Sequence, residues 1–369
     1  MRPDRHGGVM SGTSLDGVDA VVAEFASGPH VCRTLGAAHV PFPAALRHEL
    51  AALQASGDDE LARAARASVA LADCYADAVR AACDAAGLTP ADLAAVGVHG
   101  QTVRHRPDEQ WTIQLNDPAR VAERAGVTVV ADFRRRDIAA GGQGAPLVPA
   151  FHHALFGRPD RARAVVNLGG IANVTLLVPG APVRGFDTGP GNVLLDHWHA
   201  RHGGGPYDEG GAWAASGRVD HQLLHGMLAE PFFAAAPPKS TGRDMFNAGW
   251  LDAMLAHRGA AEHPADVQAT LAALTARTVA DGIRTAHARV ADVLVCGGGA
   301  RNATLMRMLA HELGPARVVP TSDEGIAVDQ VEALAFAWLA REALAGRTAS
   351  LPEVTGAAGP RVLGAIYPK

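Results

Sequence analysis

Apolar and polar positions along the first part of the chain alternate in a way that predicts strands and helices in turn. The predicted elements are, in order, strands over 7–25 and 30–42, a helix over 60–87, a strand over 92–103, a helix over 116–126 and a strand over 127–137. Gly87 is the expected C-cap of the long Ala-rich helix. Either Asn116 or Asp117 caps the next helix, which has Pro118 in its first turn.

The same order of apolar run, small-residue loop and apolar run starts again at residue 163. The elements predicted there are a hairpin over 163–180, a strand, acid-bearing loop and helix over 183–204, a long helix over 264–290, a strand–glycine–helix unit over 291–314 and a closing helix over 329–346. Strands and helices that alternate in this way predict an α/β fold with a repeat at the scale of a domain.

The length of 369 residues is more than one typical core needs, so two domains are expected. We expect a first lobe over 1–145, joined by part of the C-terminal segment, and a second lobe over 146–369. The Gly- and Pro-rich stretch 139–149 is the predicted linker and hinge between them.

Charge and composition narrow the class of partner. The net charge of −5 gives no reason to expect nucleic acid or an anionic membrane surface. No apolar stretch approaches the roughly 20 residues that cross a bilayer. The four cysteines have no CxxC spacing, which favours reduced thiols over a disulfide framework or a zinc site. We therefore expect a soluble, cytoplasmic protein.

The loop that follows the first apolar run carries chemistry suited to a phosphate. Gly12, Thr13, Ser14 and Gly17 offer backbone amides and hydroxyls, and Asp16 and Asp19 could hold Mg²⁺ through water. The alternative is an ordinary hairpin with an Asp-Gly turn. The loop is not a Walker A motif, because GxxxxGK[ST] is absent.

Two further glycine-rich turns lie in the second half. Gly169 and Gly170 form a hairpin turn like the first, and two such hairpins at the start of successive α/β halves suggest a nucleotide held by both. Gly297, Gly298 and Gly299 lie between a strand and a helix, where glycine lets the backbone approach a flat ligand. A tight strand–helix turn is the alternative, although it accounts poorly for three glycines.

Asp187, in FDTGPGN, is the candidate general base. It is predicted to end a strand on a stiff platform of small residues, which would aim a carboxylate into a cleft. The alternative is an Asx-turn or a helix N-cap. Because Asn192 already supplies a cap for the next helix, we favour catalysis.

Polar residues gather at the predicted strand ends of the first lobe. His99, Gln101, Thr102, Gln114 and Asp132 could bind the hydroxyl groups of a sugar. One arginine among Arg134, Arg135 and Arg136 could hold a carboxylate, and the alternative of a solvated charge run fits at least two of the three.

Taken together, six ordered blocks resemble the anhydro-N-acetylmuramic acid kinase family, within the actin, hexokinase and heat-shock ATPase superfamily. The blocks are MSGTSLDGVD, HGQTV, ADFRRRDIAAGGQGAPLVP, NLGGIANVT, FDTGPGN and VCGGGARN. The resemblance implies a two-lobed actin-like, ribonuclease H-like ATPase fold with a nucleotide and sugar cleft between the lobes. It also implies conversion of 1,6-anhydro-N-acetylmuramic acid, ATP and water to N-acetylmuramate 6-phosphate and ADP in peptidoglycan recycling, with Mg²⁺ and a homodimer.

The resemblance also distributes roles over the residues. It implies that Gly12, Thr13, Ser14, Leu15, Asp16, Gly17, Val18 and Asp19 hold the ATP phosphates with Mg²⁺, that Gly169 and Gly170 add amides, and that Gly297 to Gly299 face adenosine. Arg134 or Arg135 would bind the lactyl carboxylate, and Glu332 would reach the cleft unless it is a solvated helix acid. Two rivals remain: a kinase of the same fold that acts on an ordinary hexose or amino sugar, and a nucleotide-gated sensor or chaperone-like ATPase.

Overall fold

The computed structural model describes residues 4–12, 14–25, 32–237, 239–258, 263–287 and 289–369, which form two compact units. Unit 1 consists of Met1–Leu155 and Gln330–Lys369, and unit 2 of Phe156–Asp329. The chain therefore crosses between units at two points, ten residues after the expected boundary and again before the closing helix. The part of the C-terminal segment that belongs to unit 1 is 330–369.

The Gly- and Pro-rich stretch 139–149 lies inside unit 1, so the prediction that it links the two lobes is wrong. Its backbone is hydrogen-bonded: the N–H of Gln143 donates to the Thr355 carbonyl at 2.8 Å, and the N–H of Gly144 donates to Asp137 Oδ2 at 2.8 Å. The Asp137 carboxylate is fully buried and also accepts from Thr355 Oγ1 at 2.8 Å. A composition typical of linkers here forms a loop fixed by long-range hydrogen bonds.

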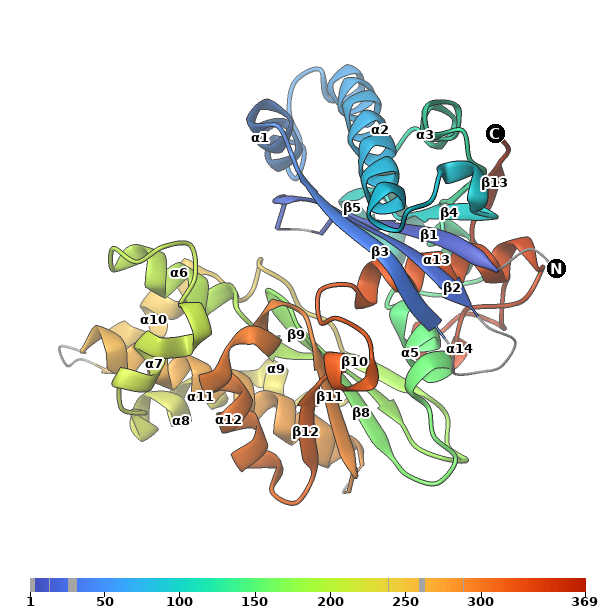
Figure 1. Ribbon diagram of the computed structural model, residues 1–369. Helices are drawn as coiled ribbons and strands as arrows, with labels where there is room; N and C mark the ends of the chain where they lie inside the picture. The colour runs from blue at the N-terminus through green and yellow to red at the C-terminus, as the bar shows by residue number, and fades with distance from the viewer. Residues whose placement is uncertain (1–3, 13, 26–31, 238, 259–262, 288) are drawn as a thin grey trace. The chain divides into compact units, whose positions relative to one another are not determined.

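Unit 1 is built on a six-stranded sheet of order β13-β7-β4-β1-β2-β3 and a separate β5–β6 ribbon (Figure 1). Its strands are β1 (Arg5–Met10), β2 (Gly17–Phe25), β3 (Cys32–Pro41), β4 (Ala95–Val98), β5 (Gln101–Arg106), β6 (Trp111–Leu115), β7 (Val129–Ala131) and β13 (Ala365–Tyr367). Its helices are α1 (Ala44–Ala52), α2 (Glu60–Ala85), α3 (Pro118–Ala125), α4 (Arg135–Ala139), α5 (Val148–Phe156, at the boundary), α13 (Val331–Leu344) and α14 (Pro352–Thr355).

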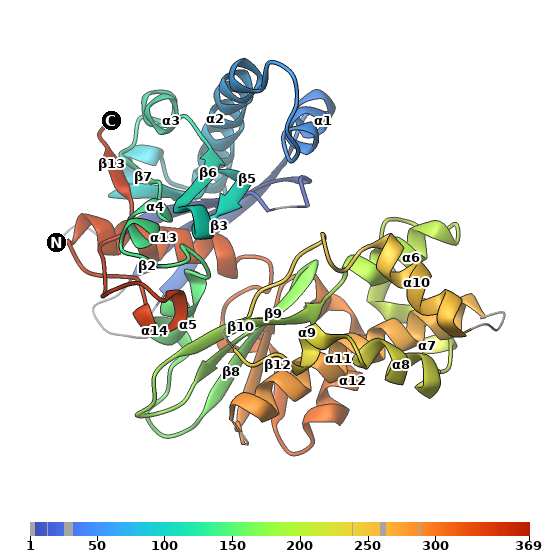
Figure 2. The same cartoon turned by 180° about the vertical axis from the view of Figure 1, so that it is seen from behind.

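Unit 2 is built on a five-stranded sheet of order β10-β9-β8-β11-β12. Its strands are β8 (Arg163–Leu168), β9 (Ile171–Leu177), β10 (Arg184–Pro190), β11 (Asp292–Cys296) and β12 (Arg317–Pro320). Its helices are α6 (Val193–Arg201), α7 (Ala212–Ser216), α8 (His221–Leu228), α9 (Pro231–Ala234), α10 (Ala248–Arg258), α11 (Pro264–Ala286) and α12 (Ala303–Leu313). Figures 1 and 2 show α6, α7, α8 and α10 gathered at one end of this unit.

The two sheets share one strand order, which confirms the predicted repeat and the α/β class. In unit 1 the antiparallel strands β3-β2-β1 are followed by the parallel strands β4 and β7, and in unit 2 β10-β9-β8 are followed by β11 and β12. In each unit the glycine-rich hairpin singled out in the sequence joins the first two strands. The repeat therefore gives each unit an equivalent loop at the end of its first strand.

The sheet of unit 1 is covered on both faces. Successive residues of β4 point to opposite sides, so Val96 and Val98 join the core under α2, whereas Ala95 joins the core under α13. Figures 1 and 2 show α2 and α13 on opposite sides of this sheet. In unit 2, α11 and α12 cover one face, where Val279 and Leu305 pack on the strands.

Helix α13 lies very close to β1 and β4 because both strands have glycine beneath it. A Cβ added at Gly8 would lie 1.9 Å from the carbonyl oxygen of Ala333, and one added at Gly97 would lie 2.0 Å from that of Phe336. Neither position needs a left-handed backbone, so the requirement is one of space. The two glycines therefore set the distance between the sheet and the helix.

Two further features bear on the expected class of protein. Cys32, Cys74 and Cys83 are free thiols. Within the described ranges, no helix combines the length and the apolar character needed to cross a bilayer.

We expect Gly8→Ala to destabilise unit 1, because the added methyl group meets helix backbone that cannot move aside. Overpacking of this kind costs about 1–3 kcal/mol or more. The matched control is Gly226→Ala, at an exposed position of helix α8, where an added Cβ meets nothing within 4 Å. That change should be neutral or stabilise by up to about 1 kcal/mol. Thermal or urea unfolding measures both, and equal stabilities for the two variants would contradict the close approach.

Candidate functional site

The loop between β1 and β2 is held from inside unit 1. Ser11 Oγ and the Tyr75 hydroxyl, both buried, are hydrogen-bonded at 2.8 Å. Gln101 Nε2 donates to the Gly12 carbonyl at 3.2 Å. Leu15 adopts a φ of 57°, an uncommon conformation for a residue with a side chain. These contacts hold Ser11 and Gly12 in place on the described part of the loop, whereas Ser14 is exposed. Thr13, a predicted phosphate contact, lies outside the described residues.

The residues predicted for this loop divide into two groups. Among the described residues, a Cβ added at Gly12 would meet only Ser14, no closer than 3.5 Å, so their packing does not require glycine there. By contrast, a Cβ at Gly17 would lie 2.5 Å from the Val40 carbonyl oxygen, so Gly17 is needed for packing against β3. The side chains of Leu15 and Val18 belong to the core of unit 1 and could offer only their backbone to a ligand.

Three acids of unit 1 lie on or near the β1–β2 hairpin. Asp16 Oδ1 accepts a hydrogen bond from Ser14 Oγ at 2.8 Å, and Asp19 Oδ1 lies 2.8 Å from His39 Nδ1 on β3. Glu332, in the first turn of α13, has its pKa raised by burial, lowered by Arg134 and raised again by the charge of Asp19. Glu332 therefore lies within electrostatic range of the hairpin acid and of a strand-end arginine.

Arg134 is the one arginine of its run that turns inward. Its Nε and Nη2 contact His99 Nε2 at 3.1 and 2.8 Å, and its Nη1 donates to the Gly144 carbonyl at 2.8 Å. Burial lowers the pKa of Arg134 to about 10, and Glu332 opposes that shift. Burial and the Arg134 charge hold the pKa of His99 well below its usual value, so the ring is neutral. Arg135 and Arg136 are exposed.

The ribbon β5–β6 carries the other predicted sugar contacts. Gln114 Nε2 donates to Thr102 Oγ1 at 3.1 Å across the ribbon. Gln101 is fully buried, and its Oε1 has no hydrogen-bond partner within the described residues. Asp132, at the end of β7, has a φ of 60° and a pKa raised by burial, with Arg135 Nε 3.7 Å from its Oδ1.

Asn116 is a site candidate that sequence reasoning missed. The cap of α3 is Asp117, whose carboxylate accepts from the N–H of Arg120 at 3.0 Å. Both amide atoms of Asn116 are buried and have no partner among the residues described. A buried polar atom without a partner costs about 1–3 kcal/mol, so such atoms indicate a water or a ligand. The sequence contains one indication of this site: either Asn116 or Asp117 can cap α3, so the side chain of the other is available for a different role.

In unit 2, the turn Gly169–Gly170 is fixed by the segment that leads into α6. The N–H groups of Gly191 and Val193 donate to the Gly170 carbonyl, and that of Asn192 donates to the Gly169 carbonyl, at 2.8–3.1 Å. A Cβ at Gly191 would lie 2.3 Å from the Gly169 carbonyl oxygen, so glycine is required there. Asn192 Nδ2 donates to the Leu168 carbonyl at 2.9 Å. The side chain of Asn192 therefore holds the hairpin, and the prediction that it caps α6 is wrong.

Packing explains two of the three glycines after β11. A Cβ at Gly297, where φ is 78°, would lie 2.4 Å from Asn167 Oδ1, and a Cβ at Gly299 would lie 2.5 Å from Leu168 Cβ. Gly298 has only Asn192 Nδ2, at 3.8 Å, near its missing Cβ. Gly298 is therefore the glycine of this turn with space beside it for a ligand.

Asp187 lies within β10, at a bulge between Asp187 and Gly189, and not at the end of a strand as predicted. The strand continues to Pro190 because the small residues after Asp187 pair with β9. Its Oδ2 accepts from the N–H of Thr241 at 2.9 Å, and its own N–H donates to the Lys239 carbonyl at 3.1 Å. These long-range bonds differ from the Asx-turn or cap considered as the alternative. Burial raises the pKa of Asp187 to about 6, although the Thr241 amide opposes the shift.

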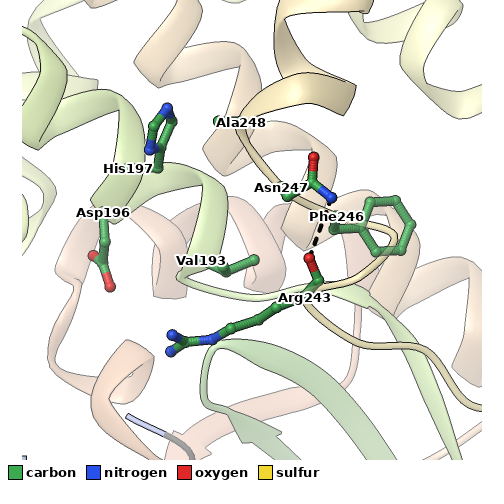
Figure 3. Close-up of a pocket in the computed structure, with 7 residues that line it drawn as sticks. All are labelled: Val193, Asp196, His197, Arg243, Phe246, Asn247 and Ala248. Carbon is green, nitrogen blue, oxygen red and sulfur yellow. Dashed lines mark hydrogen bonds between the residues drawn. The ribbon is translucent and has the colours of Figure 1, made fainter. Parts of the chain in front are cut away.

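A pocket of about 400 Å³ lies beside this hairpin in unit 2 (Figure 3). It is lined by Val193, Asp196, His197, Arg243, Phe246, Asn247 and Ala248. Burial raises the pKa of Asp196 to about 6, with Arg243 acting in the opposite direction. No sequence signal singles out Arg243, which lies far from the glycine-rich blocks along the chain.

Comparison with known proteins shows the family to which the chain belongs. The family model for anhydro-N-acetylmuramic acid kinase matches residues 4–369. A protein of that name from Bordetella pertussis is 61% identical over 364 residues, which cover 98% of this chain and 95% of the relative. One from Cupriavidus pinatubonensis is 57% identical over 373 residues, which cover 99% of each.

A solved structure shares the fold at a greater distance. Component A of the (R)-2-hydroxyglutaryl-CoA dehydratase of Acidaminococcus fermentans superposes with a TM-score of 0.50 at 13% identity, covering 92% of this chain and 99% of that one. The duplicated α/β units thus form a two-lobed ATPase fold, as predicted. With a family model that spans the described chain and relatives at this level of identity, the chain belongs to the anhydro-N-acetylmuramic acid kinase family.

Proposed function

We propose that this chain converts 1,6-anhydro-N-acetylmuramic acid, ATP and water to N-acetylmuramate 6-phosphate and ADP, in the recycling of bacterial cell wall. The observation that carries the proposal is the 61% identity, over 98% of the chain, to a relative named for this substrate. The family resemblance also supports a cytoplasmic location and a homodimer.

The substrate determines what the catalytic base must do. In an ordinary sugar kinase the base takes a proton from the 6-hydroxyl group, but here O6 is bonded to C1 and has no proton. The base must instead take a proton from water as the water oxygen bonds to C1. The C1–O6 bond breaks, and O6 bonds to the γ-phosphorus of ATP as ADP leaves. Asp187 suits this role, because burial gives its carboxyl group a pKa of about 6 and hence a base that is ionised, yet basic, at neutral pH.

The ATP phosphates would be bound by backbone amides of both hairpins. Gly12 and Ser14 of the first hairpin, with Gly169 and Gly170 of the second, provide turns fixed by hydrogen bonds on the protein side. Gly298 leaves space for the adenosine portion. The oxygen donors of Asp16 and Asp19 fit a hard cation, and these residues would hold Mg²⁺, largely through water. When bound, Mg²⁺ would neutralise charge on the phosphate groups.

The sugar would be bound by the strand-end residues of unit 1. His99, Gln101, Thr102, Gln114 and Asp132 remain our candidates, and Asn116 joins them because its amide has no partner among the described residues. For Arg134 we propose a role other than binding the lactyl carboxylate. Three of its nitrogens already donate to His99 and the Gly144 carbonyl, so we propose that it orients His99 and balances the charge of Glu332.

The reaction run in ¹⁸O-water tests the function directly. We expect turnover of the anhydro sugar with ATP to place the label on C1 of the product and none in the phosphate, as read by mass spectrometry. An ordinary hexose kinase would turn over a sugar with a free 6-hydroxyl group and incorporate no label. Absence of turnover of the anhydro sugar would refute the proposal.

Asp187→Asn should remove the base and preserve the shape of the site, since an amide oxygen can still accept from the Thr241 N–H. General-base catalysis contributes about 10²–10⁴ in rate, and the carboxylate charge near a developing cation at C1 adds to it. We therefore expect kcat to fall at least about a thousandfold, with substrate Kd changed less than about tenfold. Thermal stability should be retained or increased at neutral pH, because the variant no longer buries an ionised carboxylate. The exposed Asp323→Asn is the control and should have wild-type activity.

The pH dependence gives a second readout of the same residue. A base works in its ionised form, so a pKa of about 6 predicts that wild-type kcat/KM falls about tenfold per pH unit below pH 6 and levels off above it. A profile that stays flat down to pH 5 would assign the base to another group.

Gly12→Val should weaken ATP binding and leave the fold intact. The structure has room for a side chain at Gly12, but a branched one would cover amides proposed to meet phosphate. Loss of one charge-assisted hydrogen bond is worth about 1.5–3 kcal/mol, so we expect Kd for ATP to rise roughly 10- to 100-fold by calorimetry. Gly57→Val, in an exposed loop, is the control for the added side chain. Unchanged ATP affinity in a folded Gly12→Val variant would exclude this loop from the site.

A further inference from the structure

Arg243 reaches from the segment before α10 to the glycine hairpin of unit 2. Its Nη2 lies 3.5 Å, and its Nε 3.8 Å, from the point where a Cβ on Gly170 would stand. Figure 3 shows the side chain extended, with its guanidinium on the side of the pocket where Asp196 lies. The guanidinium therefore borders both the pocket and the turn that we propose to hold phosphate.

Arg243 is exposed, and its guanidinium has no close charged partner in the described part of the chain. None of the ion pairs or side-chain hydrogen bonds found there involves its guanidinium, although other arginines of unit 2 are paired, as Arg201 is with Asp252 and Arg301 with Asp329. Asp196 acts on it only through space, and burial already disfavours the ionised form of that acid. A cation beside a pocket without a close counter-ion is a site for an anion.

The backbone that carries Arg243 is fixed at both ends. On one side, Thr241 donates its N–H to the Asp187 carboxylate at 2.9 Å. On the other side, Phe246 is buried and stacks on Phe233 with ring centroids 5.5 Å apart. Asn247 Nδ2 also donates to the Asp244 carbonyl at 2.8 Å, and this bond closes the turn from Asp244 to Asn247. Arg243 thus lies two residues from the contact that holds the proposed base.

The wall of the pocket also offers one polar atom that the described fold does not use. His197 Nε2 is buried, and no hydrogen-bond partner for it occurs among the described residues. The pocket volume of about 400 Å³ lies within the range of small-molecule sites, about 300–1,000 Å³. A cavity of this size, with a free cation at its edge and an unpartnered imidazole nitrogen in its wall, fits a polar, anionic ligand.

We propose that Arg243 binds an oxyanion of one of the two substrates in this pocket. The inference rests on the proposed function, because that function supplies the two possible oxyanions: the triphosphate of ATP and the lactyl carboxylate of the sugar. A guanidinium can donate two parallel hydrogen bonds to either group. The hairpin at Gly170 points to phosphate. The lactyl carboxylate is the other possibility, because Arg134, one of the two arginines first considered for it, already donates to His99 and to the Gly144 carbonyl.

Separate binding measurements on Arg243→Ala and Arg243→Lys test the proposal. Calorimetry with a nonhydrolysable ATP analogue and with the anhydro sugar gives Kd for each ligand alone. We expect Arg243→Ala to raise one of these Kd values about 10- to 100-fold, the range of a lost charge-assisted pair. Arg243→Lys should recover only part of the affinity, because a point charge cannot replace a planar fork. Arg218→Ala, at an exposed arginine of the same unit, should change neither Kd.

The pattern of loss identifies the oxyanion. Weaker binding of the ATP analogue alone assigns phosphate. Weaker binding of the anhydro sugar alone assigns the carboxylate, provided that 1,6-anhydro-N-acetylglucosamine, which lacks the lactyl group, binds the wild type and the variant equally. Both Kd values within about twofold of wild type, in a variant of unchanged thermal stability, would overturn the proposal. Turnover of the anhydro sugar by the wild type is measured first, so that a failure of the proposed function is detected independently of Arg243. If that turnover is absent, binding of the ATP analogue to the wild type and to Arg243→Ala still tests the role of Arg243.

Discussion

The close approach of α13 to strands β1 and β4 is the constraint on which unit 1 depends. Gly8 and Gly97 let the helix backbone lie where any side chain would collide with it. The helix comes from the C-terminal segment, so the sheet is completed only by residues far apart in the chain. With that spacing, Phe336 packs on His99 at 4.7 Å between ring centroids, and Glu332 comes within electrostatic range of Arg134 and Asp19. The packing contact therefore also assembles the polar groups of the site.

Close packing that only glycine permits also shapes the β8–β9 hairpin of unit 2. Gly191, Gly297 and Gly299 each stand where a Cβ would collide with the Asn167–Gly169 segment. Two loops distant in sequence are thereby packed against one turn. The N–H groups of the loop before α6, together with the Asn192 side-chain amide, donate to the carbonyls of that turn. With these bonds made on the protein side, the turn keeps one conformation without a ligand. This preorganisation is what a phosphate site needs, because binding then costs little ordering of the loop.

Much of the fold could be predicted from the sequence because its signals are local. The two hairpins, the long helices and the repeat follow from apolar spacing and turn residues. The errors concern glycine-rich segments, since glycine marks close packing as readily as it marks a linker or a ligand loop. This ambiguity explains the misplaced linker at 139–149, and packing alone already accounts for glycine at Gly17 and at two of the three positions after β11. Asn116 and Arg243 were missed for another reason: a spare hydrogen bond or an unpaired charge is defined only by tertiary neighbours.

The placement of Lys239 bears on how Asp187 can work as a base. A cation paired with a carboxylate would lower its pKa and weaken it as a base. Lys239, whose carbonyl binds the Asp187 N–H, directs its ammonium group to the carbonyls of Phe232 and Phe233 at 3.0 and 3.1 Å. In the described part of the chain no ion pair includes Asp187, and its carboxylate accepts only the neutral Thr241 amide among the hydrogen bonds found there. The segment 239–247 thus holds Asp187 by backbone contacts, and no cation of this segment forms an ion pair with it. The Asp187 carboxylate therefore keeps the basicity that activation of water requires.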